Sequence, residues 1–263
     1  MADLRKTGSR GWVEEAGGFT LVELLVSVGI IAILLSIVLP ALQKVRDQAK
    51  SLICMDHLRT ASFRFRIFAD PYAHGSRGRS EGLGGRFYAA DFLDSLYETD
   101  EFWGDRSLYR ADYKPAQEPI LCPAGPRVLS RVQGLPSHVG GVQPRENISY
   151  AMNRRLHEVP AAKGGMLASV AVTERILDRP NVPLFFDADG ARATQLRGGD
   201  ADSLFSAPPR RERSPYTSAK YWHPRPRHRN RLNVGFVGGH VVSTSDPLVD
   251  PSWDWDYHPP VGR

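Results

Sequence analysis

The sequence predicts an α+β fold in which a long N-terminal helix packs against an antiparallel β-sheet, with many loops between short elements. Two observations carry this prediction. An almost uninterrupted apolar run from Leu24 to Leu39 continues into an amphipathic helical pattern that reaches Asp70. Several short β-prone segments follow in the second half of the chain, and Gly238-Gly239 separates the last two. The sequence therefore predicts a helical anchor followed by one loop-rich globular domain.

The apolar run is the first element, and it predicts a membrane-spanning helix. A span needs about 20 residues, and the residues that flank Leu24–Leu39 extend the apolar segment to residues 19–42. Glu23 is the single charged residue in this span. A carboxylate in hydrocarbon is costly unless it finds a partner, so Glu23 marks a functional position. The flanking charges do not choose an orientation for the span.

The second element continues the helix over residues 43–70. Pro40 removes one backbone hydrogen bond, so we expect it to bend the helix without ending it. Beyond Pro40 the pattern proceeds in steps of three and four residues, which predicts one buried face. That stripe comprises Leu42, Val45, Ala49, Leu52, Met55, Leu58, Ser62, Phe65 and Phe68. Asp70-Pro71 supplies the stop.

The elements after Pro71 are short. Ala89–Tyr97 predicts a helix, and Pro119–Pro123 predicts a strand end or an extended segment. Four β-prone runs follow, at Ile148–Met152, Val182–Phe186, Leu232–Val237 and His240–Thr244. The last two form a predicted hairpin, because glycines at 238 and 239 tolerate the positive φ angles of a tight turn.

Composition predicts a single polar domain beyond the helix. The chain has 263 residues and a net charge of +5, a pI near 9.3 and a mean hydropathy of −0.34, so residues 71–263 suffice for one sizeable globular domain. Residues 208–231 are rich in arginine with interleaved aromatics. Such a segment can bind nucleic acid or another polyanion, and the competing interpretation is a solvated proline-rich loop.

The residues at the start of the apolar run, Gly17-Gly18-Phe19-Thr20-Leu21-Val22-Glu23, resemble the class III signal of type IV prepilins and type II secretion pseudopilins. The resemblance implies a leader over residues 1–18, cleavage between Gly18 and Phe19, and N-methylation of Phe19. It also implies that Glu23 pairs with the amino terminus of a neighbouring subunit, and Pro40 stands where many pilins kink. An ordinary secretory signal has its small-residue cleavage site after the apolar core, whereas Gly18 precedes it.

The C-terminal half of the chain resembles prepilin-like proteins whose processing-associated domain is defined by His, nine residues, then Asp-Gly. Here His228 begins the motif, and Gly238-Gly239 stands where Asp-Gly is usual. The segments around Cys54, around Cys122-Pro123 and at Ser149–Asn153 are also similar to that group. Because Gly238 replaces the aspartate, we expect the motif to form a structural hairpin and to carry no chemistry.

Two cysteines lie beyond the anchor, in the part that pilin topology would export. Cys54 and Cys122 therefore form a disulfide or remain two isolated buried thiols. We expect no cofactor; if a metal binds, Asp187 and Asp189 are the candidate ligands for calcium, which prefers oxygen and which some similar pseudopilins bind. Neither a nucleophile with its base nor a zinc-ligand spacing is recognisable, so we expect no enzymatic activity.

These resemblances imply a structural subunit, a pseudopilin or minor pilin of a type II secretion or type IV pilus-like fibre. Its expected partners are copies of itself or other pilins, prepilin peptidase and an inner-membrane assembly platform. The expected location is the bacterial inner membrane, with a single pass and the C-terminal domain in the periplasm, and then the fibre. The alternative is a pilus-associated module that binds DNA or another polyanion through residues 208–231.

Overall fold

The computed structural model describes residues 20–75, 77, 80–96, 121–125, 148–160, 167–196, 205–209, 221–248 and 250–260. The chain divides into two compact units, Met1–Val45 and Arg46–Arg263. Its described part combines one long N-terminal helix with largely antiparallel β-structure, so the α+β prediction is confirmed. Gly18 and Phe19 lie outside the described residues.

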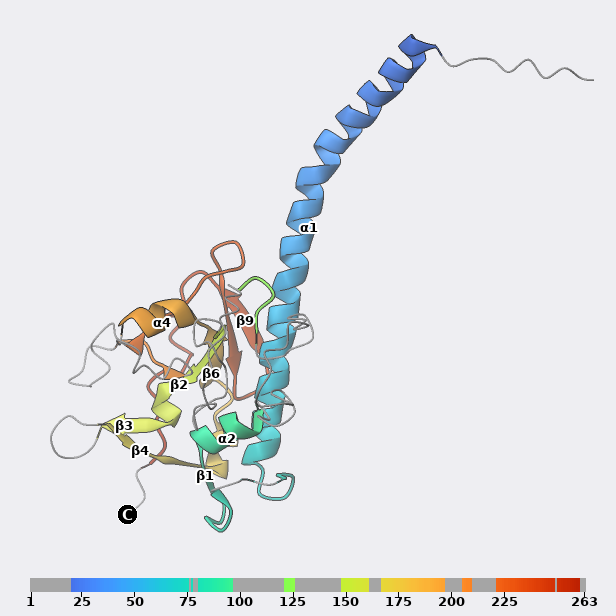
Figure 1. Cartoon of the computed structure of the whole chain (residues 1–263). Helices are drawn as coiled ribbons and strands as arrows, with labels where there is room; N and C mark the ends of the chain where they lie inside the picture. Colours follow the sequence, from blue (N-terminus) through green and yellow to red (C-terminus); the bar gives the residue numbers. More distant parts are fainter. Residues whose placement is uncertain are drawn as a thin grey trace, which may run out of the picture. The chain divides into compact units, whose positions relative to one another are not determined.

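The described elements are mostly short (Figure 1). The helices are α1 (Leu21–Ala69), α2 (Ala89–Leu96) and α4 (Gly190–Leu196), with 3-10 turns η3 (Arg154–Leu156) and η4 (Glu174–Asp178). The strands are β1 (Arg86–Tyr88), β2 (Tyr150–Asn153), β3 (Glu158–Pro160), β4 (Leu167–Ser169), β5 (Ala171–Thr173), β6 (Pro183–Asp187), β7 (Phe205–Ser206), β8 (Leu232–Phe236) and β9 (Val241–Thr244).

The first unit contains the N-terminal part of α1, which carries apolar side chains on all sides. From Leu21 to Leu39 its large aliphatic side chains are all exposed. By length and composition α1 can cross a membrane. The helix continues through Pro40, as predicted. A helix that is apolar all round requires lipid or other apolar helices around it.

In the second unit, α1 buries one face. The buried positions recur every three or four residues and are Cys54, His57, Leu58, Ala61, Ser62, Phe65, Phe68 and Ala69. The predicted stripe is therefore confirmed from Leu58 to Phe68, but it is wrong for its N-terminal positions Leu42, Val45, Ala49 and Leu52, which are exposed. The buried face begins at Cys54, and the exposed part of the predicted stripe precedes it.

The C-terminal end of α1 is held by two polar contacts. The backbone N–H of Tyr72 donates to Asp70 Oδ1 at 2.8 Å, so Asp70-Pro71 ends the helix as predicted. The buried guanidinium of Arg77 donates from Nε and Nη2 to the carbonyl oxygen of Phe68, at 3.0 and 2.8 Å. Arg77 thus satisfies a carbonyl that the end of a helix leaves without an intrahelical partner.

The main sheet has five strands in the order β7-β2-β6-β8-β9. Pairs β2–β6, β6–β8 and β8–β9 are antiparallel, while β7 pairs with β2 in parallel. Strands therefore form at four predicted positions. Of the segment Pro119–Pro123, only residues 121–123 are described, and they form no strand: the chain bends at Leu121 and turns at Pro123, where the N–H of Gly125 donates to the Cys122 carbonyl at 2.8 Å.

Each face of the sheet contributes to a separate core. One core joins α1 and α2 to the sheet through Phe65, Phe92 and Phe185; Figure 1 shows α2 and the sheet beside the C-terminal half of α1. The other core contains Phe186, Val234 and Phe236 with Trp253 and Trp255 from the C-terminal segment. Because alternate residues of β6 and β8 point to opposite faces, both faces of these central strands are buried.

The hairpin between β8 and β9 forms as predicted, but its two glycines serve different purposes. Gly239 has φ +86°, where a side chain is strained. At Gly238 there is no room for a side chain, because a Cβ there would lie 2.9 Å from the Cβ of Pro180 and 3.0 Å from its carbonyl oxygen. An aspartate at Gly238 would therefore displace Pro180, which explains the departure from the usual Asp-Gly.

Candidate functional site

Glu23 lies in the first turn of α1 and forms a capping box with Thr20. The backbone N–H and hydroxyl of Thr20 donate to Glu23 Oε2 at 2.9 and 2.8 Å, and the backbone N–H of Glu23 donates to Thr20 Oγ1 at 3.2 Å. Ser or Thr followed three residues later by Glu is the signature of this cap, so the spacing Thr20-x-x-Glu23 could have identified it. In this chain alone, the Glu23 carboxylate already has hydrogen-bond donors.

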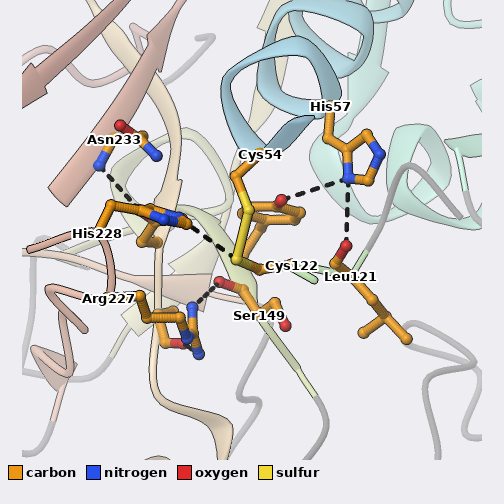
Figure 2. Close-up of a disulfide and its surroundings, with 11 residues drawn as sticks. Cys54, His57, Leu121, Cys122, Ser149, Arg227, His228 and Asn233 are labelled. Atoms are coloured by element: carbon orange, nitrogen blue, oxygen red, sulfur yellow. Dashed lines mark hydrogen bonds between the residues drawn. A yellow bond between two sulfur atoms is a disulfide. The ribbon is translucent and has the colours of Figure 1, made fainter. Parts of the chain in front are cut away.

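The second cluster surrounds a disulfide between Cys54 in α1 and Cys122 in the segment 121–125 (Figure 2). Their Cα atoms lie 5.4 Å apart, within the usual range for a disulfide. Both residues are buried in the core on the α1 side of the sheet. Of the two states that the sequence leaves open, the structure contains the bonded one.

Two histidines flank this disulfide. His228 precedes β8 and places Nε2 3.4 Å from Cys122 Sγ. Burial, together with the neighbouring Arg227 guanidinium, lowers the pKa of His228 to about 4, so its imidazole is neutral at neutral pH. His57 lies in α1, and its Nδ1 is 3.1 Å from the carbonyl oxygen of Leu121. Burial also lowers the pKa of His57.

A buried polar network continues from His228 into the sheet. The backbone N–H of Asn233 donates to Asp187 Oδ2 at 2.8 Å, and Arg227 Nη1 donates to the carbonyl oxygen of Ser149 at 2.9 Å. Asp187 is fully buried. Burial raises its pKa to about 7, against the opposing effects of the Arg227 guanidinium and the Asn233 N–H. No local pattern in the sequence marks Arg227 or Asn233 as members of this network, because they pair across strands.

The two candidate calcium ligands have other polar partners in this arrangement. Asp189 forms an ion pair with Arg225 at 3.1 Å and accepts from the N–H of Arg192 at 3.1 Å, while Arg227 faces Asp187. Among the described residues, the Oδ1 atom of Asp187 is buried without a hydrogen-bond partner. These contacts describe the two carboxylates and do not test calcium binding.

The described part of the arginine-rich segment is also engaged within the domain. Besides Arg225 and Arg227, Arg231 donates from Nε to Ser243 Oγ at 3.3 Å. Arg229 and Asn230 have φ angles of 54° and 61°, and the N–H of Arg231 closes this turn on the His228 carbonyl at 3.1 Å. Residues 210–220, which hold much of the positive charge, lie outside the described residues.

The two ends of the motif that begins at His228 thus lie in different parts of the domain. His228 contacts the disulfide, whereas Gly238 and Gly239 lie at the β8–β9 turn beside Pro180. Strand β8 occupies most of the interval between them. The spacing of the motif therefore corresponds to one strand that connects the disulfide region to the hairpin.

Comparison with known proteins assigns the N-terminal segment. The family model described as the prokaryotic N-terminal methylation motif matches residues 16–39. No curated protein and no solved structure matches the chain. The matched segment covers the expected cleavage site and most of the apolar run, and it leads into the long helix α1. The chain therefore carries a prepilin-type N-terminal methylation motif, which supports a type IV pilin-like or pseudopilin-like precursor anchored in a membrane.

Proposed function

We propose that this protein is a pseudopilin or minor pilin, a structural subunit of a type II secretion or type IV pilus-like fibre. The observation that carries the proposal is the methylation motif over residues 16–39, which runs directly into helix α1, whose apolar segment up to Leu42 has Glu23 as its one carboxylate. Prepilin peptidase removes residues 1–18 and methylates Phe19. Residues 19–42 then cross the inner membrane once, residues 43–70 continue the helix, and residues 71–263 form the periplasmic domain.

Glu23 is the residue that couples membrane anchoring to assembly in this proposal. Within the chain its carboxylate is satisfied by Thr20, which offsets part of the cost of placing it beside hydrocarbon. In the fibre, the methylated amino group of Phe19 from a neighbouring subunit replaces these neutral donors. A charged donor forms the stronger hydrogen bond, so a subunit gains from this exchange only when a neighbour is present.

The first test is the processing step. Intact-mass analysis and N-terminal sequencing of the membrane form should find a chain that begins at methylated Phe19. Replacing the small residue before the cut, Gly18→Val, should leave the leader attached. A mature wild-type protein that still begins at Met1 would remove the basis of the proposal.

The second test separates anchoring from assembly. Glu23→Ala should keep membrane insertion, because it removes the cost of burying a carboxylate, but cross-linking should detect few neighbour contacts. Thr20→Val is the matched control: it breaks the same capping box, at a cost of about 1 kcal/mol in helix stability, while leaving the carboxylate available. Normal assembly by Glu23→Ala, or equal failure of both variants, would exclude pairing through Glu23.

A further inference from the structure

The sulfur atoms of the disulfide and one imidazole nitrogen form a compact set of potential metal ligands. Cys54 Sγ, Cys122 Sγ and a ring nitrogen of His228 all lie within 4.8 Å of one another, and all three residues are buried. They come from three separate segments: α1, the segment 121–125 and the turn before β8. Figure 2 shows the His228 ring directed at the sulfur of Cys122.

We propose that, when this disulfide is reduced, Cys54, Cys122 and His228 bind a thiophilic divalent ion such as zinc. Two thiolates and one imidazole are a ligand set that zinc accepts, with solvent in a fourth position. The two states exclude each other, since a metal requires the sulfur atoms as thiolates while the disulfide joins them. The same three side chains thus provide a covalent or a metal-based connection between α1 and the rest of the domain.

One of the observed distances already matches tetrahedral coordination. With zinc–sulfur and zinc–nitrogen bonds of about 2.3 and 2.0–2.1 Å, a sulfur and a nitrogen ligand stand about 3.5 Å apart. His228 Nε2 already lies 3.4 Å from Cys122 Sγ. Reduction would allow the two sulfur atoms to separate to the roughly 3.8 Å that two ligands of a tetrahedral ion need. The charges also balance, because two thiolates neutralise a divalent cation.

The chemical steps are simple to state. Reduction adds two electrons and two protons to the disulfide and yields two thiols; a water-soluble phosphine supplies the electrons and becomes the phosphine oxide by taking its oxygen from water. Metal binding then releases both thiol protons to solvent. Oxidation by a disulfide-forming oxidant expels the metal and restores the covalent link.

The experiment is a cobalt(II) titration of the full chain in detergent, with and without prior reduction by the phosphine. Reduced wild type should bind one cobalt per chain and show thiolate-to-cobalt charge-transfer absorption together with the visible bands of tetrahedral cobalt. Zinc should displace the cobalt, and the oxidised protein should show neither signal. If reduction loosens the domain, cobalt should also restore its circular dichroism spectrum.

Two histidine variants make the test specific. His228→Gln should weaken cobalt binding by at least about a hundredfold, because replacing even an outer-shell partner costs 10- to 100-fold. His57→Gln is the matched control, since it changes another buried histidine beside the same disulfide and should leave the affinity within a fewfold of wild type. Equal spectra for both variants, or no signal from reduced wild type, would overturn the proposal.

Discussion

Removing the disulfide should strongly destabilise the globular domain. Cys54 and Cys122 are separated by 68 positions in the sequence, and closing a loop of that length in the unfolded chain corresponds to about 4 kcal/mol in the chain-entropy description. The double replacement Cys54→Ala and Cys122→Ala also deletes two buried sulfur atoms, which adds about 1 kcal/mol of lost packing. We therefore expect the free energy of unfolding to fall by about 4–5 kcal/mol.

A loss of this size is a large share of the 5–15 kcal/mol that stabilises a typical domain. It corresponds to a fall in Tm of roughly 10–20 °C for a domain of about 200 residues. Urea unfolding of the full chain in detergent, with a metal chelator present, measures it. Fluorescence of the buried Trp253 and Trp255 reports loss of the core on the far side of the sheet from α1.

Reduced wild-type protein is the matched control, because it loses the covalent link but keeps both sulfur atoms. It should account for about 4 kcal/mol of the decrease, and the remaining difference from the double variant measures packing alone. A double variant within about 1 kcal/mol of wild type would refute the reasoning. It would mean that residual contacts between α1 and the sheet, and not the disulfide, restrict the conformations of the unfolded chain.

Three further changes test the fold and its polar network. Gly238→Asp should lower the free energy of unfolding by about 1–3 kcal/mol through overlap with Pro180, and a urea midpoint equal to wild type would contradict this. Arg77→Leu should lower it by about 3 kcal/mol, because the Phe68 carbonyl loses a charged donor; unchanged amide exchange near Ala69 would argue against the cap. Asp187 has a folded pKa of about 7, so the folded state binds the extra proton between pH 4 and 7 and the contribution of Asp187 to stability falls as pH rises. Asp187→Asn should therefore gain about 1.4 kcal/mol relative to wild type for each pH unit across that window, and a difference that does not vary with pH would exclude the raised pKa.

Local patterns in the sequence accounted for the elements that have a strong periodic signal. The apolar run predicted a helix that could cross a membrane, and the spacing from Leu58 to Phe68 predicted the buried face of α1. Glycines at the β8–β9 turn predicted the hairpin. The three-residue strands β1, β3, β4 and β5 were not predicted, because three residues carry too little alternation to distinguish a strand from a loop.

The errors in detail also have physical causes. Helical periodicity sets the spacing of buried residues but not where a sheet begins to cover them, so Leu42, Val45, Ala49 and Leu52 belong to the predicted stripe and yet are exposed. Strand β7 has two residues and pairs in parallel with β2. This pairing depends on the path that the chain takes between the two strands. The cap between Thr20 and Glu23 was present in the local sequence as a capping box and could have been predicted.

The N-terminal part of the proposed function follows from the amino-acid sequence alone. The methylation motif and the carboxylate at Glu23 lie in one contiguous segment, and their spacing along the chain is enough to identify them. The other contacts arise only in the folded chain. Cys54, Cys122 and His228 meet although 68 positions separate the two cysteines and a further 106 separate Cys122 from His228, and Arg227 lies beside Asp187 because the chain returns along the sheet. Such contacts depend on which strands pair and which face α1 covers, and these choices are made by the whole core and not by any one segment.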